Sequence, residues 1–467
     1  MGDAAHDLVI IGSGPGGYVA AIRAGQLGLS VLVVEKDAML GGTCLHRGCI
    51  PTKALLHTAD LLQQARDGAK FGVVATGVAL DLAAAHTHKR RVVTKNAKGI
   101  ESLFKKHKVA WVQGTGRLAG AHTVEVTKAD GTVERYQAKN VIVATGSRCG
   151  DLPFLAADGD RLLNSDHILE LAEVPPRLLV LGAGAVGMEF ASVFSRFGSK
   201  VTVVELLDRV LPLEDADVSA EVAKAFRRQG IEVHVATRVE EAKVVDGVVR
   251  CKAVTANGTA LELEADKLLL AVGRQANFKG IGLESTRVQI ERGRIVVDQF
   301  GRTHEDGVYA IGDLLATPWL AHVASMQGVL AAEHIAGKNP PPINYNQVPS
   351  CTYCWPEVGA IGLSEARARE QGYDVRVGTF PFTASGKAAI LGETAGFVKV
   401  VAEAKYDEVL GLHIVGAGAT ELIAEGEAAL RGELTAEELI RTIHAHPTMH
   451  EAIHEAAEGV HGATIHF

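Results

Sequence analysis

The chain has 467 residues, 47% of them hydrophobic and 22% charged, with 47 basic against 55 acidic side chains and a net charge of −8. This length and ordinary globular composition predict about two to four packed domains and exclude a disulfide-stabilised miniprotein or a disordered tail protein. The mild acidity argues against nucleic acid or an anionic membrane as the main partner, and no apolar run is long enough to span a bilayer. The N-terminus lacks the stages of a signal peptide, so we expect a cytoplasmic enzyme.

The N-terminal residues predict a nucleotide-binding unit with the order strand, glycine-rich turn, helix, strand and glutamate. The predicted elements are a strand at residues 7–11, a turn at 12–17, a helix at 18–27 and a strand at 31–34. Gly12 permits the tight turn, Gly14 lets the backbone approach a pyrophosphate, and Gly17 lets the helix pack on the strand. The helix N-terminus offers free amides to phosphates, and Glu35 is placed to accept hydrogen bonds from ribose hydroxyls.

Cys44 and Cys49 follow Glu35 closely, in the sequence GGTCLHRGCIPTK. The chain has six cysteines, too few and too unevenly spread for an extracellular disulfide framework. The spacing lets the two sulfurs come within disulfide range, and a helix N-terminus or Lys53 is expected to lower a thiol pKa. A redox dithiol is therefore predicted. Two buried small cysteines, or half of a metal site, are the alternatives.

A second unit repeats the same order and ends at Glu205. Its predicted elements are strands at residues 177–181 and 201–204 and a helix at 188–197, with glycines at Gly182, Gly184 and Gly187. Two such units indicate two cofactors used in series, such as a flavin and a nicotinamide, whereas two glycine-rich turns without a ligand are the alternative. The Glu205 carboxylate favours NAD over NADP because it repels a 2′-phosphate, although Arg209 lies nearby.

Each unit ends in a strand that stops at a small residue and a glycine, at residues 140–146 and 267–273. Residues 122–139 and 232–266 predict antiparallel insertions around Asp-Gly turns. A proline cluster at 339–342 marks a break in the chain. The elements predicted beyond it are strands at 348–361 and 396–418 and helices at 421–431 and 435–443. They predict an α+β domain at the C-terminus.

Six of the 19 histidines lie beyond residue 443. His450, Glu451 and His454 form the pattern HExxH, which on a helix places two histidines on one face for zinc and supplies a glutamate as general base. Pro447 predicts that this helix starts at residue 448. A zinc metallopeptidase is therefore an alternative from a different class of protein, and a metal assay would distinguish it.

The sequence GGTCLHRGCIPTK resembles the redox-disulfide signature of the flavin-dependent pyridine nucleotide-disulfide oxidoreductases, and the resemblance covers nearly the whole chain. Further matches are ATG at residues 144–146, AIGD at 310–313, LAH at 320–322 and HPTMHE at 446–451. The implied fold class is α/β, with two Rossmann-like dinucleotide-binding domains and a C-terminal α+β dimerisation domain. The implied domains are FAD-binding at 1–149 and 275–347, NAD-binding at 150–274 and interface at 348–467.

The resemblance also implies a role for each matching residue. The residues implied to bind FAD are Gly12, Gly14, Gly17, Glu35, Lys53, Thr145, Gly146, Asp313 and Ala321, and those implied to bind NAD are Gly182, Gly184, Gly187, Glu205 and Gly273. In such enzymes the second cysteine, here Cys49, faces the flavin, and Cys44 exchanges with the substrate. Lys53 is implied to pair with Glu189.

His446 is implied to be the acid/base, with Glu451 orienting it. One glutamate does not easily serve both this pair and a zinc site, so the zinc interpretation ranks lower. Because the C-terminal domain forms the dimer interface in such enzymes, His446 is implied to reach the cysteines of the other subunit. The resemblance therefore implies a homodimer.

Within the family the chain is most similar to members that oxidise dihydrolipoamide to lipoamide and reduce NAD+ to NADH. The implied partners are lipoyl domains of 2-oxoacid dehydrogenase or glycine cleavage complexes, with no nucleic acid and no membrane. Glutathione and mercuric reductases are the alternatives. Glutathione reductases carry cations where this chain has Glu205-Leu206-Leu207, and mercuric reductases typically end in a cysteine pair that this chain lacks.

Two departures from the family pattern remain. Gln275-Ala276-Asn277 follows Gly273-Arg274, which leaves local contacts of the nicotinamide site open. Cys351 and Cys354 form a CxxC in a segment predicted to be a strand. Buried strand cysteines are the favoured interpretation, because redox CxxC motifs lie at helix N-termini, and a redox role is the alternative.

Overall fold

The computed structural model describes residues 6–467. The chain divides into two compact units, each gathered from three segments. Unit 1 comprises Met1–Ala54, Ala84–Gly150 and Arg274–Tyr345, and unit 2 comprises Leu55–Ala83, Asp151–Gly273 and Asn346–Phe467; residues 1–5 lie outside the described part. The three-domain division expected from the sequence stays a prediction.

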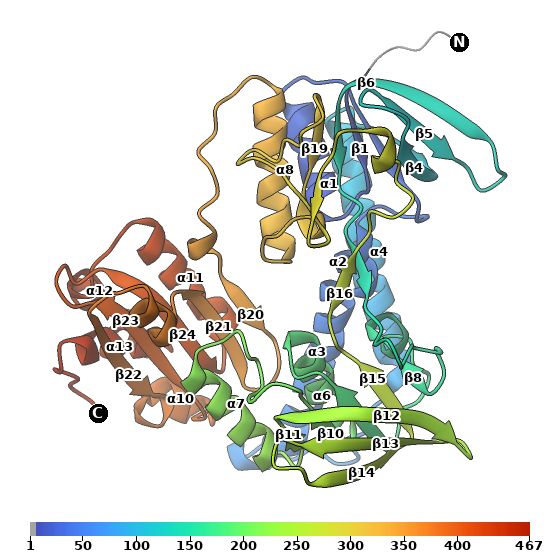
Figure 1. Ribbon diagram of the computed structural model, residues 1–467. Helices are drawn as coiled ribbons and strands as arrows, with labels where there is room; N and C mark the ends of the chain where they lie inside the picture. Colours follow the sequence, from blue (N-terminus) through green and yellow to red (C-terminus); the bar gives the residue numbers. More distant parts are fainter. Residues whose placement is uncertain (1–5) are drawn as a thin grey trace. The chain divides into compact units, whose positions relative to one another are not determined.

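Unit 1 is built on a mixed sheet with β1 at its centre (Figure 1). Its strands are β1 (His6–Ile11), β2 (Val31–Glu35), β3 (Ala110–Gln113), β4 (Thr115–Leu118), β5 (Thr123–Thr127), β6 (Val133–Val143) and β19 (Val308–Ala310). β1 pairs in parallel with β2 and β6, and β6 pairs in parallel with β19 and antiparallel with β5. All of β2 and the last four residues of β1 are buried, which explains why these parallel strands are continuous apolar runs.

The helices of unit 1 place the first glycine turn and the cysteine pair. They are α1 (Pro15–Gln26), α2 (Gly42–Arg47), the start of α3 (Cys49–Asp67), α4 (Leu82–Lys106) and α8 (Ala321–Ile335). α1 and α8 lie side by side, and a Cβ at Gly328 would come within 2.4 Å of the Gly16 carbonyl oxygen. Short elements complete the unit: β7 (Ser147–Cys149), β16 (Arg274–Ala276), β17 (Ile290–Glu291), β18 (Arg294–Ile295), η2 (Leu283–Ser285), η3 (Gly312–Leu314) and η4 (Tyr345–Gln347), the last of which ends in unit 2.

Unit 2 contains a parallel sheet with the order β11-β10-β9-β15-β8 and an antiparallel sheet of β12, β13 and β14. These strands are β8 (Leu162–Leu163), β9 (Arg177–Leu181), β10 (Lys200–Val204), β11 (Glu232–His234), β12 (Thr237–Val245), β13 (Val248–Thr255), β14 (Ala260–Ala265) and β15 (Lys267–Leu270). The helices of this part are α5 (Ser165–Ile168), α6 (Ala185–Phe197) and α7 (Ala216–Arg228), and η1 (Gly68–Phe71) follows α3. The second glycine turn joins β9 to α6.

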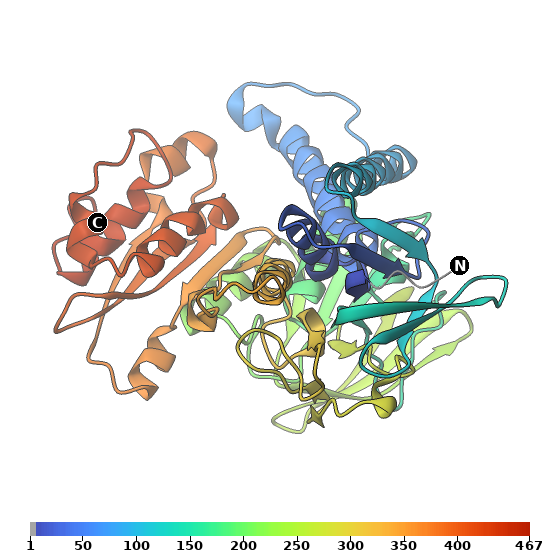
Figure 2. The ribbon, with the colours of Figure 1, turned by 90° about the horizontal axis from the view of Figure 1, so that it is seen from above.

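The C-terminal part of unit 2 is an antiparallel sheet with the order β20-β21-β24-β23-β22 and helices packed against it (Figure 2). The strands are β20 (Ser350–Thr352), β21 (Glu357–Gly362), β22 (Val375–Pro381), β23 (Phe397–Glu403) and β24 (Val409–Gly416). The helices are α9 (Glu365–Glu370), η5 (Phe382–Ala384), α10 (Gly386–Leu391), α11 (Ala419–Arg431), α12 (Ala436–Arg441) and α13 (Glu451–Val460). α11 contacts β21 and β24, and α13 contacts β22 and β23.

The predicted fold class is confirmed, but several helix starts differ from the sequence-based expectation, those of α11 and α12 by only one or two residues. α1 begins at Pro15 and α6 at Ala185, earlier than predicted, because the extended residues Gly14 and Gly184 are the N-caps. α13 begins at Glu451 rather than at residue 448, after a turn in which the Thr448 hydroxyl donates to the Ala445 carbonyl oxygen. No helix in residues 6–467 is long and apolar enough to cross a membrane.

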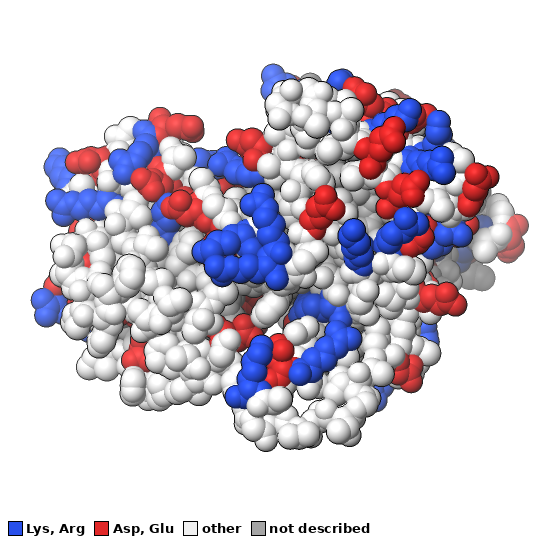
Figure 3. All heavy atoms as spheres, turned by 90° about the horizontal axis from the view of Figure 1, so that it is seen from below, with Lys and Arg blue, Asp and Glu red and all other residues white. Residues whose placement is uncertain are grey.

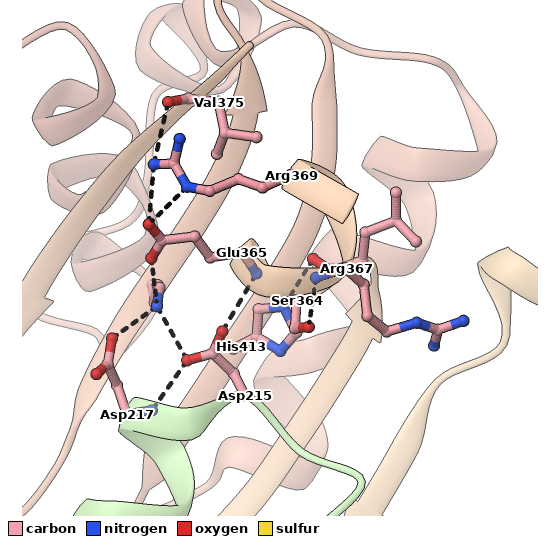
Figure 4. Close-up of polar contacts among 10 residues, drawn as sticks. Asp215, Asp217, Ser364, Glu365, Arg367, Arg369, Val375 and His413 are labelled. Carbon is pink, nitrogen blue, oxygen red and sulfur yellow. Dashed lines mark hydrogen bonds and ion pairs between the residues drawn. The ribbon is translucent and has the colours of Figure 1, made fainter. Parts of the chain in front are cut away.

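A buried lysine of β23 joins three carboxylates within unit 2 (Figure 4). The Nζ atom of Lys399 lies 2.9 Å from Asp215 Oδ1, 2.6 Å from Asp217 Oδ2 and 3.0 Å from Glu365 Oε2. Asp215 is also the N-cap of α7, since its side chain accepts from the Asp217 N–H. Lys399 therefore fastens the first turn of α7 and the start of α9 to the C-terminal sheet.

Replacing Lys399 by methionine is expected to lower the free energy of unfolding by about 3 kcal/mol, because Asp215 remains buried without a counter-ion. Burial disfavours the charged form of Asp215, but hydrogen bonding from Lys399, the charges of His413 and Lys399 and the Asp217 N–H together outweigh it, so the pKa of Asp215 is lowered from 3.8. Hydrogen bonding from Arg369, and to a smaller extent from Lys399, lowers the pKa of Glu365 from 4.5. The ionised Asp215 and Glu365 therefore stabilise the folded state at pH values above 3.8 and 4.5, respectively. This stabilisation is lost as the pH falls through their lowered pKa values.

Thermal unfolding followed by circular dichroism at pH 7 and at about pH 3 checks this expectation. The matched control is Lys243→Met, which removes an exposed lysine paired with Glu241 and is expected to change stability by less than about 0.5 kcal/mol. Equal midpoints for Lys399→Met and the wild type at neutral pH would contradict the role of Lys399.

Candidate active site

The first glycine turn has the geometry of a phosphate cradle. Gly12 has a φ of +104°, and a Cβ there would lie 2.4 Å from the Ala144 carbonyl oxygen. A Cβ at Gly17 would lie 1.9 Å from the Gly12 carbonyl oxygen, so only glycine allows α1 to approach β1 this closely. A Cβ at Gly14 would meet nothing within 4 Å. The backbone at Gly14 therefore borders open space at the N-terminus of α1, where a pyrophosphate fits.

The second glycine turn repeats this geometry in unit 2. Gly182 has a φ of +100°, and its Cβ would lie 2.4 Å from the Ala271 carbonyl oxygen. A Cβ at Gly187 would lie 1.9 Å from the Gly182 carbonyl oxygen, and a Cβ at Gly184 would meet nothing within 4 Å. Gly273, just after β15, has a φ of +114° and equally open surroundings. Unit 2 thus offers a second cradle with the same backbone path.

The glutamates that close the two second strands are both buried and are held by backbone amides. Glu35 accepts from the Ser13 N–H at 2.8 Å and from the Asp37 N–H at 2.8 Å. Glu205 accepts from the Ala183 N–H at 2.6 Å and from the Leu207 N–H at 2.8 Å. An ionised carboxylate has about four acceptor positions, so each glutamate can also accept from a ribose hydroxyl.

A cluster of polar groups surrounds Asp313 at the end of β19. The Ser147 hydroxyl donates to Asp313 Oδ2, and Arg274 Nε donates to the Ser147 hydroxyl oxygen at 2.7 Å. The Thr145 hydroxyl donates to the Asn277 carbonyl oxygen at 2.5 Å, and a Cβ at Gly146 would meet nothing within 4 Å. Asp313 thus keeps a carboxylate oxygen that can accept from a sugar-like hydroxyl. Sequence reasoning missed Ser147 and Arg274.

Ala321 is the first residue of α8, and Leu320 is its N-cap in extended conformation. The amides of this first turn have no acceptor within the helix, and no side-chain cap accepts from them. An electron-rich ring oxygen is the kind of acceptor that such a helix end binds. Ala321 therefore lies at a helix end that could hold such a group, and its contact with FAD stays a prediction.

The two cysteines come together at a break between two helices of unit 1. Cys44 lies in α2, and Cys49 is the first residue of α3, just after Gly48. A Cβ at Gly48 would lie 3.2 Å from the Cys44 Cα, so glycine permits the tight connection. A Cβ at Gly42 would lie 2.5 Å from the Gly14 Cα, which places the start of α2 directly against the first glycine turn.

Cys44 and Cys49 are both in the reduced form, and the Cys44 thiol resists ionisation. Hydrogen bonding with Cys49 is the largest cause, and burial adds to it, so the pKa of Cys44 is raised; Lys53 opposes this only weakly. Lys53 and the backbone N–H of Cys49, at the N-terminus of α3, each act to lower the pKa of Cys44 as expected, but these effects are smaller than those that raise it. A thiol of this kind needs a base to take its proton before it can act as a nucleophile.

His446 and Glu451 lie within hydrogen-bond distance of each other in unit 2, as the predicted pair requires. His446 Nδ1 lies 2.8 Å from Glu451 Oε1, and the Thr448 N–H donates to Glu451 Oε2 at 2.9 Å. Burial opposes ionisation of Glu451, but the bonds from Thr448 and His446 outweigh it and lower the pKa of Glu451. The His446 side chain is 79% exposed, so its Nε2 is open to another molecule.

The pattern HExxH does not assemble as the zinc interpretation requires. His450 is the N-cap of α13, and its Nδ1 lies 2.8 Å from Glu425 Oε2. His454 Nε2 lies 3.8 Å from Glu458 Oε1, and Glu451 is engaged with His446. Within residues 6–467, no group of three or more histidine, cysteine or acidic side chains is arranged to hold a metal ion.

Glu425 of α11 is a residue of this site that sequence reasoning missed. Its carboxylate contacts His444 Nε2 at 2.7 Å and His450 Nδ1 at 2.8 Å, on either side of His446 in the chain. His444 Nδ1 also faces the Thr442 carbonyl oxygen at 2.9 Å. Glu425 therefore holds both ends of the loop that presents His446. The pairing of one helical glutamate with two later histidines has no local sequence signal.

The second cysteine pair lies in a different environment. Cys351 is part of β20, and Cys354 follows that strand and is completely buried. Burial is the main cause that raises the pKa of Cys354. The adjacent Tyr353 N–H donates to Glu189 Oε1 at 3.0 Å, which fixes Glu189 of α6 within unit 2. The pairing of Lys53 with Glu189 stays a prediction.

The chain matches two family models. Residues 6–328 match the model described as pyridine nucleotide-disulphide oxidoreductase, and residues 348–457 match its dimerisation domain. The chain is 43% identical to the dihydrolipoyl dehydrogenase of Bacillus subtilis over 99% of both chains. It is 44% identical to the dihydrolipoyl dehydrogenase of Chlorobaculum tepidum over 97% of both.

Solved structures give a similar result. LpdA from Mycobacterium tuberculosis superimposes with a TM-score of 0.89 and 28% identity, covering 97% of this chain and 98% of that one. The HOCl-induced flavoprotein disulfide reductase RclA from Escherichia coli, in its Cu(II) complex, superimposes with a TM-score of 0.87 and 26% identity, covering 97% of this chain and 99% of that one.

Proposed function

Since the chain belongs to the pyridine nucleotide-disulphide oxidoreductase family, we propose that it oxidises dihydrolipoamide to lipoamide and reduces NAD+ to NADH. The observation that carries this proposal is the Cys44 and Cys49 pair, set at the junction of α2 and α3 against the first glycine turn. Identity over almost the full length to proteins named dihydrolipoyl dehydrogenase supports the substrate class.

The residues of unit 1 fit FAD, and those of the second glycine turn fit NAD. In the proposal, Gly12, Gly14, Gly17 and Glu35 hold the adenosine diphosphate portion of FAD, while Lys53, Thr145, Gly146, Asp313 and Ala321 hold the rest. Gly182, Gly184, Gly187, Glu205 and Gly273 hold NAD. When bound, FAD supplies the two-electron carrier between the dithiol and the nicotinamide. The open space at Gly14 and Gly184 supports both assignments.

The cysteines perform the exchange with the substrate. A substrate thiolate attacks Cys44 Sγ in the disulfide form, which makes a mixed disulfide and releases Cys49 as a thiolate. The second substrate thiolate then attacks the sulfur bonded to Cys44, closes the substrate disulfide and releases the Cys44 thiolate. The substrate loses two protons and two electrons, and the electrons reside on the two cysteines.

His446 is the proposed acid/base of this exchange. Its Nε2 takes the proton from each substrate thiol in turn and returns one to the Cys44 thiolate, which the raised pKa of Cys44 favours. Glu451 keeps Nδ1 protonated and stabilises the imidazolium that forms at His446. Glu189 is proposed to pair with Lys53. The exposure of His446 supports its use by the cysteines of a second subunit.

The proposed enzyme is a homodimer, and the match to a dimerisation domain supports this assembly. Its proposed partners are lipoyl domains of 2-oxoacid dehydrogenase or glycine cleavage complexes. We place it in the cytoplasm, a reducing compartment in which a disulfide serves catalysis rather than structure. Size-exclusion chromatography with light scattering measures directly whether the enzyme is a homodimer.

Glu205 is proposed to set the preference for NAD over NADP. Glu205→Gln is expected to lower kcat/KM for NAD+ about tenfold, because hydrogen bonds to charged groups contribute about 1.5–3 kcal/mol. The same change is expected to lower the ratio of kcat/KM for NAD+ to kcat/KM for NADP+. Steady-state kinetics with both nucleotides measure the effect. Glu232→Gln, at an exposed strand position of the same sheet, is the control, and an unchanged nucleotide ratio in Glu205→Gln would contradict the role of Glu205.

The proposed function is tested by a spectrum and a steady-state assay of the purified holoenzyme. We expect a flavin absorbance and NAD+-dependent oxidation of dihydrolipoamide, with little activity toward glutathione and NADPH or toward mercuric ion. A colourless protein after incubation with FAD, or a preference for glutathione with NADPH, would overturn the proposal.

A further inference from the structure

The helix α4 concentrates positive charge on an otherwise acidic chain. Residues 82–108 contain eight lysines and arginines against a single acid, Glu101, and carry +7, while the whole chain carries −8. The remaining residues therefore carry −15. Figure 3 shows a face on which basic and acidic side chains are intermixed, which is the usual state of a solvated surface. The composition of α4 differs from that pattern.

The cations of α4 lie on the side opposite its buried face. Val93, Ala97, Ile100 and Phe104 are buried in the core of unit 1. Arg91, Lys95, Lys98, Lys105 and Lys106 follow one another at spacings of four, three, seven and one residues, which place them on one side of the helix, and all are exposed. Arg91 to Lys106 spans about 22 Å at 1.5 Å per residue, comparable with one face of a small protein domain.

This basic face has no acidic partner within the described chain. The structure gives Arg91 a hydrogen bond to His88, one turn earlier, and Lys95, Lys98, Lys105 and Lys106 form no ion pair with any residue of 6–467. Like charges at spacings of three and four residues destabilise a helix, so this arrangement opposes folding. Lys105 and Lys106 gain from the helix dipole in the last turn, but Arg91, Lys95 and Lys98 lie too far from it.

The helix that carries the basic face shares a hydrophobic core with the helix that carries Cys44. Leu45, adjacent to Cys44 in α2, belongs to the same hydrophobic core cluster as Val93, Ala97, Ile100 and Phe104 of α4 (Figure 1). A molecule held on the outer face of α4 is therefore held on the same unit that carries Cys44 and Cys49. A nucleic acid gains nothing from this placement, whereas a protein that carries a dithiol does.

We propose that the outer face of α4, formed by Arg91, Lys95, Lys98, Lys105 and Lys106, is the docking surface for an acidic protein domain that carries the dithiol substrate. The inference rests on the proposed function and adds a site that distinguishes a carrier-bound dithiol from a free one. Electrostatic attraction raises the association rate of the acidic carrier and weakens as salt screens it. Free dihydrolipoamide, which is neutral, gains nothing from the basic face.

The test compares two substrates on the holoenzyme: free dihydrolipoamide and an isolated, acidic lipoyl domain in its reduced form. The variant is Arg91→Glu/Lys95→Glu/Lys98→Glu. The matched control is Arg227→Glu/Lys279→Glu/Lys338→Glu, which makes the same charge change at three exposed positions elsewhere. At low ionic strength, kcat/KM for the lipoyl domain is expected to fall at least about tenfold in the α4 variant only. kcat/KM for free dihydrolipoamide stays unchanged in both variants.

Salt and nucleic acid complete the test. In the wild type, kcat/KM for the lipoyl domain is expected to fall as sodium chloride rises, and the α4 variant is expected to lose most of this dependence. An equal loss for both substrates, an equal loss in the control, or no loss for the domain would overturn the docking surface. Binding of duplex DNA at physiological salt that disappears in the α4 variant would also overturn it. A wild type that oxidises neither dithiol would instead refute the proposed function.

Discussion

Cys44→Ser is expected to lower the oxidation of dihydrolipoamide by about three orders of magnitude or more, to the limit of detection. Serine cannot form the mixed disulfide with the substrate, so the first bond of the exchange is never made. The variant is expected to keep its flavin and part of the electron transfer from NADH to a dye, which does not require Cys44. Steady-state assays of both reactions and an absorbance spectrum measure these effects.

Cys351→Ser is the matched control for this change, because it replaces a thiol in β20 outside the proposed site. It is expected to leave dihydrolipoamide oxidation unchanged, and a large loss there would reopen the redox interpretation of the Cys351 and Cys354 pair. Substantial lipoamide turnover by Cys44→Ser would contradict the exchange role of Cys44. Loss of the flavin in that variant would count against a purely chemical role.

His446→Gln is expected to lower lipoamide turnover by about 10²- to 10⁴-fold, the usual contribution of general acid–base catalysis. Glutamine keeps a polar group near Glu451, but it cannot take the proton of a thiol. Each substrate thiol must lose its proton before it attacks, and the released Cys44 thiolate, whose pKa is raised, must regain one, so the exchange depends strongly on His446. Bound FAD and the absorbance that reports the cysteine-to-flavin contact are expected to change little.

His461→Gln provides the control for this substitution within the same C-terminal segment. His461 Nε2 contacts Asp407 Oδ1 at 2.8 Å, away from the loop that presents His446. The control is expected to retain wild-type turnover with dihydrolipoamide. Unchanged turnover in His446→Gln would refute the role of His446 as acid/base.

The features that sequence analysis could predict are those whose physical cause lies within a few residues. Gly12 has a positive φ that the tight turn requires, and Gly17 packs against the Gly12 carbonyl oxygen, so their pattern is informative by itself. Cys44 and Cys49 are likewise a local pair, separated by four residues of which the last is Gly48. The observed starts of α1 and α6 precede the predicted ones because the second glycine of each turn is the N-cap. The pattern of apolar residues does not reveal this cap.

The features that sequence analysis missed join residues that are distant in the chain. Ser147 bonds to Asp313 across 166 positions, and Lys399 bonds to Asp215 across 184. Glu425 precedes the two histidines that it contacts by 19 and 25 positions. A glutamate in an amphipathic helix ordinarily faces solvent, so nothing in the sequence around Glu425 separates it from its neighbours. Such pairs follow from the fold as a whole.

The central claim is that Cys44 and Cys49 alternate between a disulfide and two thiols during turnover. Alkylation of the oxidised holoenzyme with and without excess NADH under anaerobic conditions, followed by peptide mass spectrometry, tests this most directly. The account predicts that NADH makes these two cysteines, and no others, newly available to the alkylating reagent. An unchanged labelling pattern with NADH would contradict it.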